Sequence, residues 1–119
     1  MHMENTSLQK VVARYIEAFE KEDLGIIEDI YAFDASVEDP VGSDPHHGLA
    51  AIKAFYKKAF EMGVKLQLEG QPRCAGNSVA FCFHVLMPGI KISPIDVFEL
   101  NDAGKIQRMR AYWGPENMG

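Results

Sequence analysis

The hydrophobic period of this 119-residue chain changes once, close to Gly63. Before that point apolar residues recur every three or four positions, as on one face of a helix, whereas after it they alternate, as on one face of a strand. Helices followed by an antiparallel meander are typical of an α+β domain. We therefore expect a single domain over residues 1–119, with three helices on one face of a curved sheet and an apolar pocket between the layers.

Three helices are predicted in the first half of the chain. The first spans residues 4–21 and carries the apolar stripe Leu8, Val11, Val12, Tyr15, Ala18 and Phe19. A short second helix, capped by Asp23, carries Ile27, Ile30 and Tyr31 on one face. The third spans residues 48–62, ends at Gly63, and buries Leu49, Ile52, Phe55, Tyr56, Ala59 and Phe60.

The rest of the chain predicts extended structure and turns. Residues 33–39 form a short extended segment, and residues 40–48 form a loop because they contain two prolines and two glycines. Pro94 interrupts the third of the later strands and favours a sheet edge, a bulge or a strand start there. The later strands are predicted at 64–69, 79–87, 90–100 and 105–113, with a tight turn at 101–104.

Composition excludes several classes of partner. Acidic residues outnumber basic ones 17 to 12, and the basic residues form no stripe, so nucleic acid is not expected as a partner. No apolar run approaches the ~20 residues of a membrane span, so no membrane association is expected. The polar start Met1–Asn5 lacks an apolar signal core, which favours a cytoplasmic location. Cys74 and Cys82 match no metal motif and are expected to be reduced thiols.

Asp96 lies on an apolar face of a predicted strand. Alternation along Ile95–Leu100 places it beside Phe98 and Leu100. Burial disfavours the ionised carboxylate, and the protonated acid can donate a hydrogen bond to a developing oxyanion. Alternatively, Glu99 faces solvent beside Ile95 and Val97, and Asp96 forms a salt bridge at the edge of the sheet.

Tyr15, Tyr31 and Tyr56 fall on the apolar stripes of three different predicted helices. A buried hydroxyl needs a hydrogen-bond partner, so helices that converge on one sheet would bring these hydroxyls to one another or to a buried acid. A chain of fixed dipoles stabilises an oxyanion with little reorganisation. Three independent core tyrosines would give the same sequence pattern.

A second pair of acids, Glu38 and Asp39, precedes Pro40. In an extended segment Asp39 shares a face with Val37, so Asp39 is the one expected to point inward. A carboxylate at the mouth of an apolar pocket can act as a general base. Aspartate before proline is also common turn chemistry, and both interpretations fit these residues.

Several large apolar side chains are core candidates that could equally form the walls of a site for a flat hydrophobic ligand: Phe19, Phe55, Phe60, Phe81, Phe83, Met109 and Trp113. His46 and His47 lack the partner cluster that a metal site needs, so no metal is expected. The chain has no nucleophile, phosphate-loop or dinucleotide motif, and we expect no cofactor.

Taken together, these segments resemble the bacterial Δ5-3-ketosteroid isomerases, which are small proteins of the cone-shaped nuclear-transport-factor-2-like fold. The Tyr-Ala-x-Asp-Ala stretch is shared across the wider superfamily, whereas the joint presence of Tyr15, Asp39 and Asp96 is more specific. The stretch from His84 to Pro94 departs from the family pattern, which leaves pocket shape and substrate preference open. The matching segments are 13–17, 31–40, 47–48, 54–56, 95–97, 104–106 and 109–113.

The resemblance implies a mixed, mostly antiparallel sheet, a steroid substrate, no cofactor and a homodimer formed through the exposed side of the sheet. It implies that Asp39 moves a proton, that Tyr15 and protonated Asp96 hold a dienolate oxygen, and that Tyr31 and Tyr56 support Tyr15. Two other kinds of function fit the same fold: a non-catalytic binder of polycyclic ligands, and another enzyme such as a hydrolase, dehydratase or cyclase.

Overall fold

The computed structural model describes residues 4–119, so the prediction made from the polar start of the chain lies partly outside it, at Met1–Met3. The helices are α1 (Asn5–Lys21), α2 (Leu24–Ile30) and α3 (Leu49–Glu61), followed near the C-terminus by a 3-10 turn at Pro115–Asn117. The strands are β1 (Tyr31–Glu38), β2 (His46–His47), β3 (Lys65–Ala75), β4 (Ser78–Met87), β5 (Ile90–Ile92), β6 (Ile95–Leu100) and β7 (Ile106–Tyr112).

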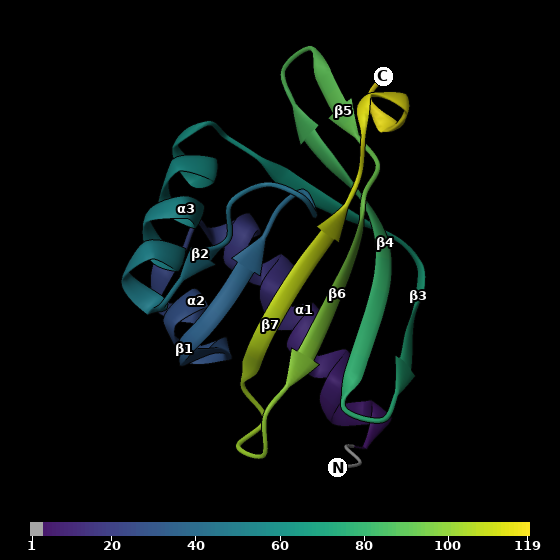
Figure 1. Cartoon of the computed structure of the whole chain (residues 1–119). Coiled ribbons are helices and arrows are strands. Elements are labelled where there is room, and N and C mark those ends of the chain that lie inside the picture. The colour runs from purple at the N-terminus through teal and green to yellow at the C-terminus, as the bar shows by residue number, and fades with distance from the viewer. Residues whose placement is uncertain (1–3) are drawn as a thin grey trace.

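One sheet contains all the strands, in the order β2-β1-β7-β6-β4-β3, with β5 paired to the end of β4. Among the strands described in residues 4–119, only the β1–β7 pairing is parallel, and the others are antiparallel. The helices cover one face of this sheet, and α1 runs across it behind β7, β6 and β4 (Figure 1). The predicted α+β architecture is therefore confirmed, as is the mixed, mostly antiparallel sheet.

Local signals fix the helix boundaries. The carboxylate of Asp23 accepts a hydrogen bond from the Gly25 amide at 2.8 Å, as expected of a helix cap. Gly63 follows α3 with a φ of +75°, a left-handed conformation that glycine adopts at little cost. The predicted stripe of α1 is buried at Leu8, Val12, Tyr15, Ala18 and Phe19.

Three details differ from the sequence prediction. Tyr31 was expected on the second helix, but α2 ends at Ile30 and Tyr31 begins β1 in an extended conformation. The predicted loop contains a two-residue strand, because His46 and His47 pair with Val37 and Ser36. β3 continues well past the predicted end at residue 69, because a register shift between Glu69 and Arg73 lets pairing with β4 resume.

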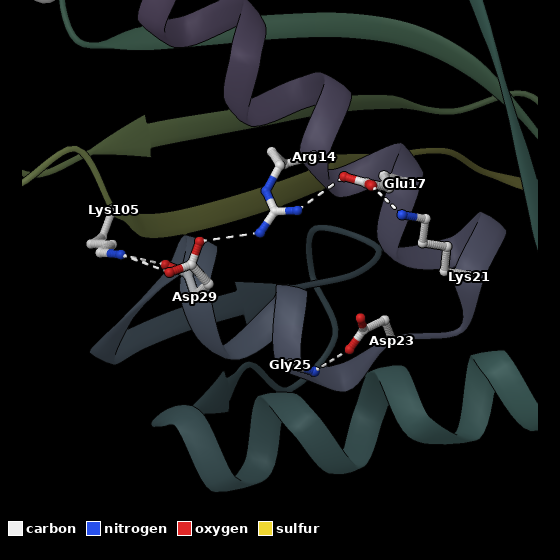
Figure 2. A network of polar contacts seen from close by, with 7 residues as sticks. All are labelled: Arg14, Glu17, Lys21, Asp23, Gly25, Asp29 and Lys105. Carbon is white, nitrogen blue, oxygen red and sulfur yellow. Dashed lines mark hydrogen bonds and ion pairs between the residues drawn. The ribbon is translucent and has the colours of Figure 1, made fainter.

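An ion-pair network on the surface joins elements that are distant in sequence (Figure 2). Arg14 of α1 contacts Glu17 at 2.9 Å and Asp29 of α2 at 3.3 Å. Asp29 also lies 3.5 Å from Lys105, which precedes β7. Exposed pairs contribute little individually, so we attribute orientation of α1 against α2 to this network and most of the stability to the buried core.

Within residues 4–119, no helix is long and apolar enough to cross a membrane. Cys74 and Cys82 are both free thiols, and Cys82 is exposed on the face of the sheet opposite the helices.

Candidate active site

The main cavity lies between the helices and the concave face of the sheet. Phe19 of α1 and Phe55 of α3 form part of its helical wall. Most of its lining is apolar, and the polar groups are two tyrosines and two aspartates. The lining comprises Tyr15, Phe19, Asp39, Phe55, Tyr56, Ala59, Val64, Leu66, Phe83, Val85, Ile92, Pro94, Asp96, Ala111 and Trp113.

The three predicted tyrosines meet, although Tyr31 comes from a strand. The Tyr56 hydroxyl lies 2.5 Å from that of Tyr31 and donates to that of Tyr15 at 3.3 Å. Each phenol has one proton, so Tyr31 must donate to Tyr56, and Tyr15 donates its proton to neither of the other two tyrosines. Burial raises the pKa of all three hydroxyls well above the ordinary tyrosine value, so the three linked hydroxyls stay protonated.

Asp96 is only 1% exposed and shares its face of β6 with buried Phe98 and Leu100, as predicted. Burial raises its pKa well above the usual carboxyl range, the charge of Asp39 adds to this rise, and the Tyr15 hydroxyl lowers it in part. Asp96 Oδ2 has no hydrogen-bond partner among residues 4–119. A protonated acid with an unpaired oxygen in an apolar cavity is therefore a free hydrogen-bond donor.

Asp39 follows the end of β1 and is partly buried at the cavity wall. The indole N–H of Trp113 donates to its Oδ1 at 2.7 Å. Burial raises the pKa of Asp39, while the Trp113 hydrogen bond and the nearby His46 lower it. The carboxylate is thus held in one orientation by a neutral donor and has no lysine or arginine partner among the described residues.

The predicted ligand-contacting residues divide into two groups. Phe19, Phe55, Phe83 and Trp113 line the main cavity. Phe60, Phe81 and Met109 do not line it, because their side chains fill the core between the helices and the sheet. Phe81, for example, stacks edge-on against Tyr15 and Phe98.

Replacing Phe81 with alanine is expected to affect stability rather than binding alone. The ring is 2% exposed, and removing it leaves a cavity among other aromatic rings. Truncation of a buried phenylalanine typically costs about 3–5 kcal/mol. Urea denaturation should show that loss, and a loss below about 1 kcal/mol would contradict a core role for Phe81.

Sequence reasoning missed several cavity residues. Leu66 lies on β3, Val85 on β4 and Ile92 at the end of β5, and Pro94 lies in the link between β5 and β6. Three of them lie in the segment 84–94 that departs from the family pattern. The first three were predicted as strand residues and Pro94 as a break in a strand, but no feature of the sequence showed which strand ends close the cavity.

Residues 4–119 contain no group of three or more histidine, cysteine or acidic side chains placed to hold a metal ion. His46 instead stacks on Phe55, with ring centroids 4.6 Å apart.

Comparison with known families places this geometry in context. The sequence model of the SnoaL-like domain family matches residues 12–109, which include Tyr15, Asp39 and Asp96. The chain belongs to the SnoaL-like family. This assignment confirms the predicted nuclear-transport-factor-2-like cone fold, within which all three residues reach one cavity.

Two relatives of the SnoaL-like chain are informative about chemistry. It is 36% identical over 118 residues to a steroid Delta-isomerase of Nocardioides simplex, an alignment that covers 96% of this chain and 95% of the relative. A solved structure of SalBIII, an epoxide hydrolase/cyclase-like enzyme in pyran ring formation in polyether salinomycin, superimposes with a TM-score of 0.90 and 29% identity over 98% of this chain and 97% of that one. Both names support an enzyme, and the similarity to the isomerase supports a small hydrophobic substrate.

Proposed function

We propose that this protein is a steroid Δ-isomerase that converts 3-oxo-Δ5-steroids to 3-oxo-Δ4-steroids. One observation carries the proposal: a partly buried carboxylate, Asp39, and two buried donors, Tyr15 and Asp96, line the same apolar cavity. Removing a proton next to a ketone requires both a base and a means of holding the enolate oxygen. The similarity to a steroid Delta-isomerase supports this assignment.

In the proposed reaction, ionised Asp39 takes a proton from C4, between the ketone and the C5–C6 double bond. The electron pair of that C–H bond moves into the ring system and gives a dienolate. Asp39 then returns the same proton to C6, which leaves the double bond conjugated with the ketone and regenerates the carboxylate. The proposed reaction requires no cofactor, and the proton passes from C4 to C6 through Asp39 without being released to solvent.

Two donors hold the dienolate oxygen in this proposal. Tyr15 donates its proton, and the chain from Tyr31 through Tyr56 stabilises the charge that Tyr15 acquires. Asp96 donates from the protonated carboxyl that burial favours. Because these dipoles are fixed before the substrate arrives, they stabilise the transition state without reorganisation in a largely apolar cavity.

The test is direct. Purified protein is mixed with 5-androstene-3,17-dione, and the ultraviolet absorbance of the conjugated enone is followed. Enzyme-dependent growth of that absorbance is expected. Absence of turnover, with a phenolic steroid still bound, would instead indicate a binder that uses the same cavity.

A cyclase or epoxide hydrolase is the second candidate, favoured by the similarity to the SalBIII structure. The same two acids could serve, since a protonated Asp96 could donate to an epoxide oxygen while Asp39 accepts a proton from the attacking hydroxyl. Incubation with a hydroxy-epoxide and mass-neutral conversion to a cyclic ether would support this alternative, whereas inert epoxide and rapid enone formation would exclude it.

The homodimer is also a proposal. Ile95 and Tyr112 are cross-strand neighbours on the outer face of the sheet, and both are over 40% exposed. A second copy could cover this apolar pair, and light scattering of the purified protein would reveal a mass of one chain or two.

Trp113→Phe is expected to shift the acid side of the pH profile of kcat/KM toward higher pH. The indole N–H favours the ionised form of Asp39, so its loss raises the pKa of Asp39 and leaves less active base at low pH. We expect kcat/KM on the acid side to fall by about tenfold, with a smaller loss at alkaline pH. Phe83→Leu, which alters the cavity wall without touching that hydrogen bond, should leave the midpoint in place. A uniform loss across pH would rule out this positioning role.

A further inference from the structure

A second depression, the mouth groove, continues the main cavity outward. It shares Asp39, Phe55 and Trp113 with the cavity and adds Lys58, Met62 and Met87. Tyr15 and Asp96 line the cavity but not the groove. Asp39 therefore lines both depressions, whereas the two donors line the cavity alone.

The α3 sequence places one cation beside this apolar path. Phe55 and Lys58 of α3 and Met62, which directly follows the helix, are spaced three and four residues apart, so they lie on one side of it. Lys58 is exposed and forms no ion pair or side-chain hydrogen bond with any residue between 4 and 119. By contrast, Lys53 on the same helix is paired with Glu28 at 2.7 Å.

The direction of a bound steroid follows from the proposed function, on which this inference rests. If Tyr15 and Asp96 hold the ketone oxygen and Asp39 serves the adjacent ring, the remaining rings run past Asp39 toward the mouth groove. A substituent at the far end of the skeleton then lies beside Lys58. The chain carries a net charge of −5, so an anionic substituent needs a local cation to offset the general repulsion.

We propose that the preferred substrates are 3-oxo-Δ5-steroids that carry a carboxylate on the side chain at C17, and that Lys58 binds this carboxylate. The apolar groove receives the carbons of the side chain, and the ammonium group receives its charged end. Lys58 thus selects among steroids without taking part in the proton transfer.

The experiment compares two substrates that differ only in charge: a 3-oxo-Δ5-steroid with a C17 propanoate side chain and its primary amide. Wild-type protein is expected to show a kcat/KM for the acid about three- to tenfold above that for the amide. Lys58→Glu should reverse this preference. Lys57→Glu is the matched control, because Lys57 is also exposed on α3 but lies outside the groove, and it should leave the ratio unchanged.

Failure of this inference and failure of the isomerase proposal give different results. Turnover of both substrates with no preference, or equal effects of the two lysine variants, would overturn the role of Lys58 and leave the isomerase standing. If neither substrate is converted, calorimetry with the matching 3-oxo-Δ4 acid and amide decides the question. Preference for the acid that is lost in Lys58→Glu would support the binding site, and equal or absent binding would overturn it.

Discussion

Asp39→Asn is expected to lower kcat for 5-androstene-3,17-dione by about 10⁴-fold, the upper end of what a positioned general base contributes. The amide matches the carboxylate in shape, and its carbonyl oxygen can still accept the Trp113 N–H bond seen at 2.7 Å. It cannot accept a proton from carbon. Stopped assays of the conjugated enone over hours would measure the residual rate.

The dissociation constant of a 3-oxo-Δ4-steroid should change much less than kcat in this variant, since the cavity keeps its shape. Glu38→Gln provides the matched control, because Glu38 precedes Asp39 but its carboxylate accepts a hydrogen bond from the Gly42 amide outside the cavity, at 2.9 Å. That variant should retain full turnover. A parallel loss of binding and turnover in Asp39→Asn would argue against a base.

The features that sequence predicted correctly rest on short-range rules. Alternation alone placed Asp96 on the face of Phe98 and Leu100, and the structure buries all three. The same rule placed Asp39 on the inward face with Val37; Val37 is buried in the core, and Asp39 lines the cavity. Helical spacing identified the buried stripe of α1, including Tyr15, because one face of an amphipathic helix packs against the core.

The features that sequence did not predict depend on contacts between distant segments. Tyr31 continues the apolar spacing of α2, yet pairing with Ile106 of β7 draws it into β1. His46 becomes extended only because Val37 offers it a strand edge. The strand ends that close the cavity, such as Ile92, are placed by the curvature of the whole sheet, which no local pattern encodes.

Asp96→Leu is expected to lower kcat by about 10²–10³-fold, the typical loss for one donor of an oxyanion site. Leucine has the same branched shape but cannot donate, so Tyr15 would hold the dienolate oxygen alone. Enone formation measured at saturating substrate would show this loss, with Asp96→Asn retaining more activity because its amide still donates. An unchanged rate in Asp96→Leu would remove Asp96 from the oxyanion site.

The same substitution should stabilise the protein at neutral pH. Burial raises the pKa of Asp96 in the folded state, so between the unfolded and folded pKa values the native protein holds a proton that the unfolded chain has released. Stability therefore falls as pH rises through that window. Leucine removes this dependence and the unpaired Oδ2, a gain of about 1–3 kcal/mol at pH 7.

Urea denaturation of both proteins between pH 4 and pH 8 checks this prediction. The difference in unfolding free energy between the two proteins should shrink as the pH falls toward about 4, the ordinary carboxyl pKa, because the unfolded chain then also holds the proton. A difference that does not vary with pH would mean that Asp96 has the same pKa in both states. A variant with a higher unfolding free energy but a lower kcat would instead indicate that Asp96 destabilises the folded protein and is retained because it serves the reaction.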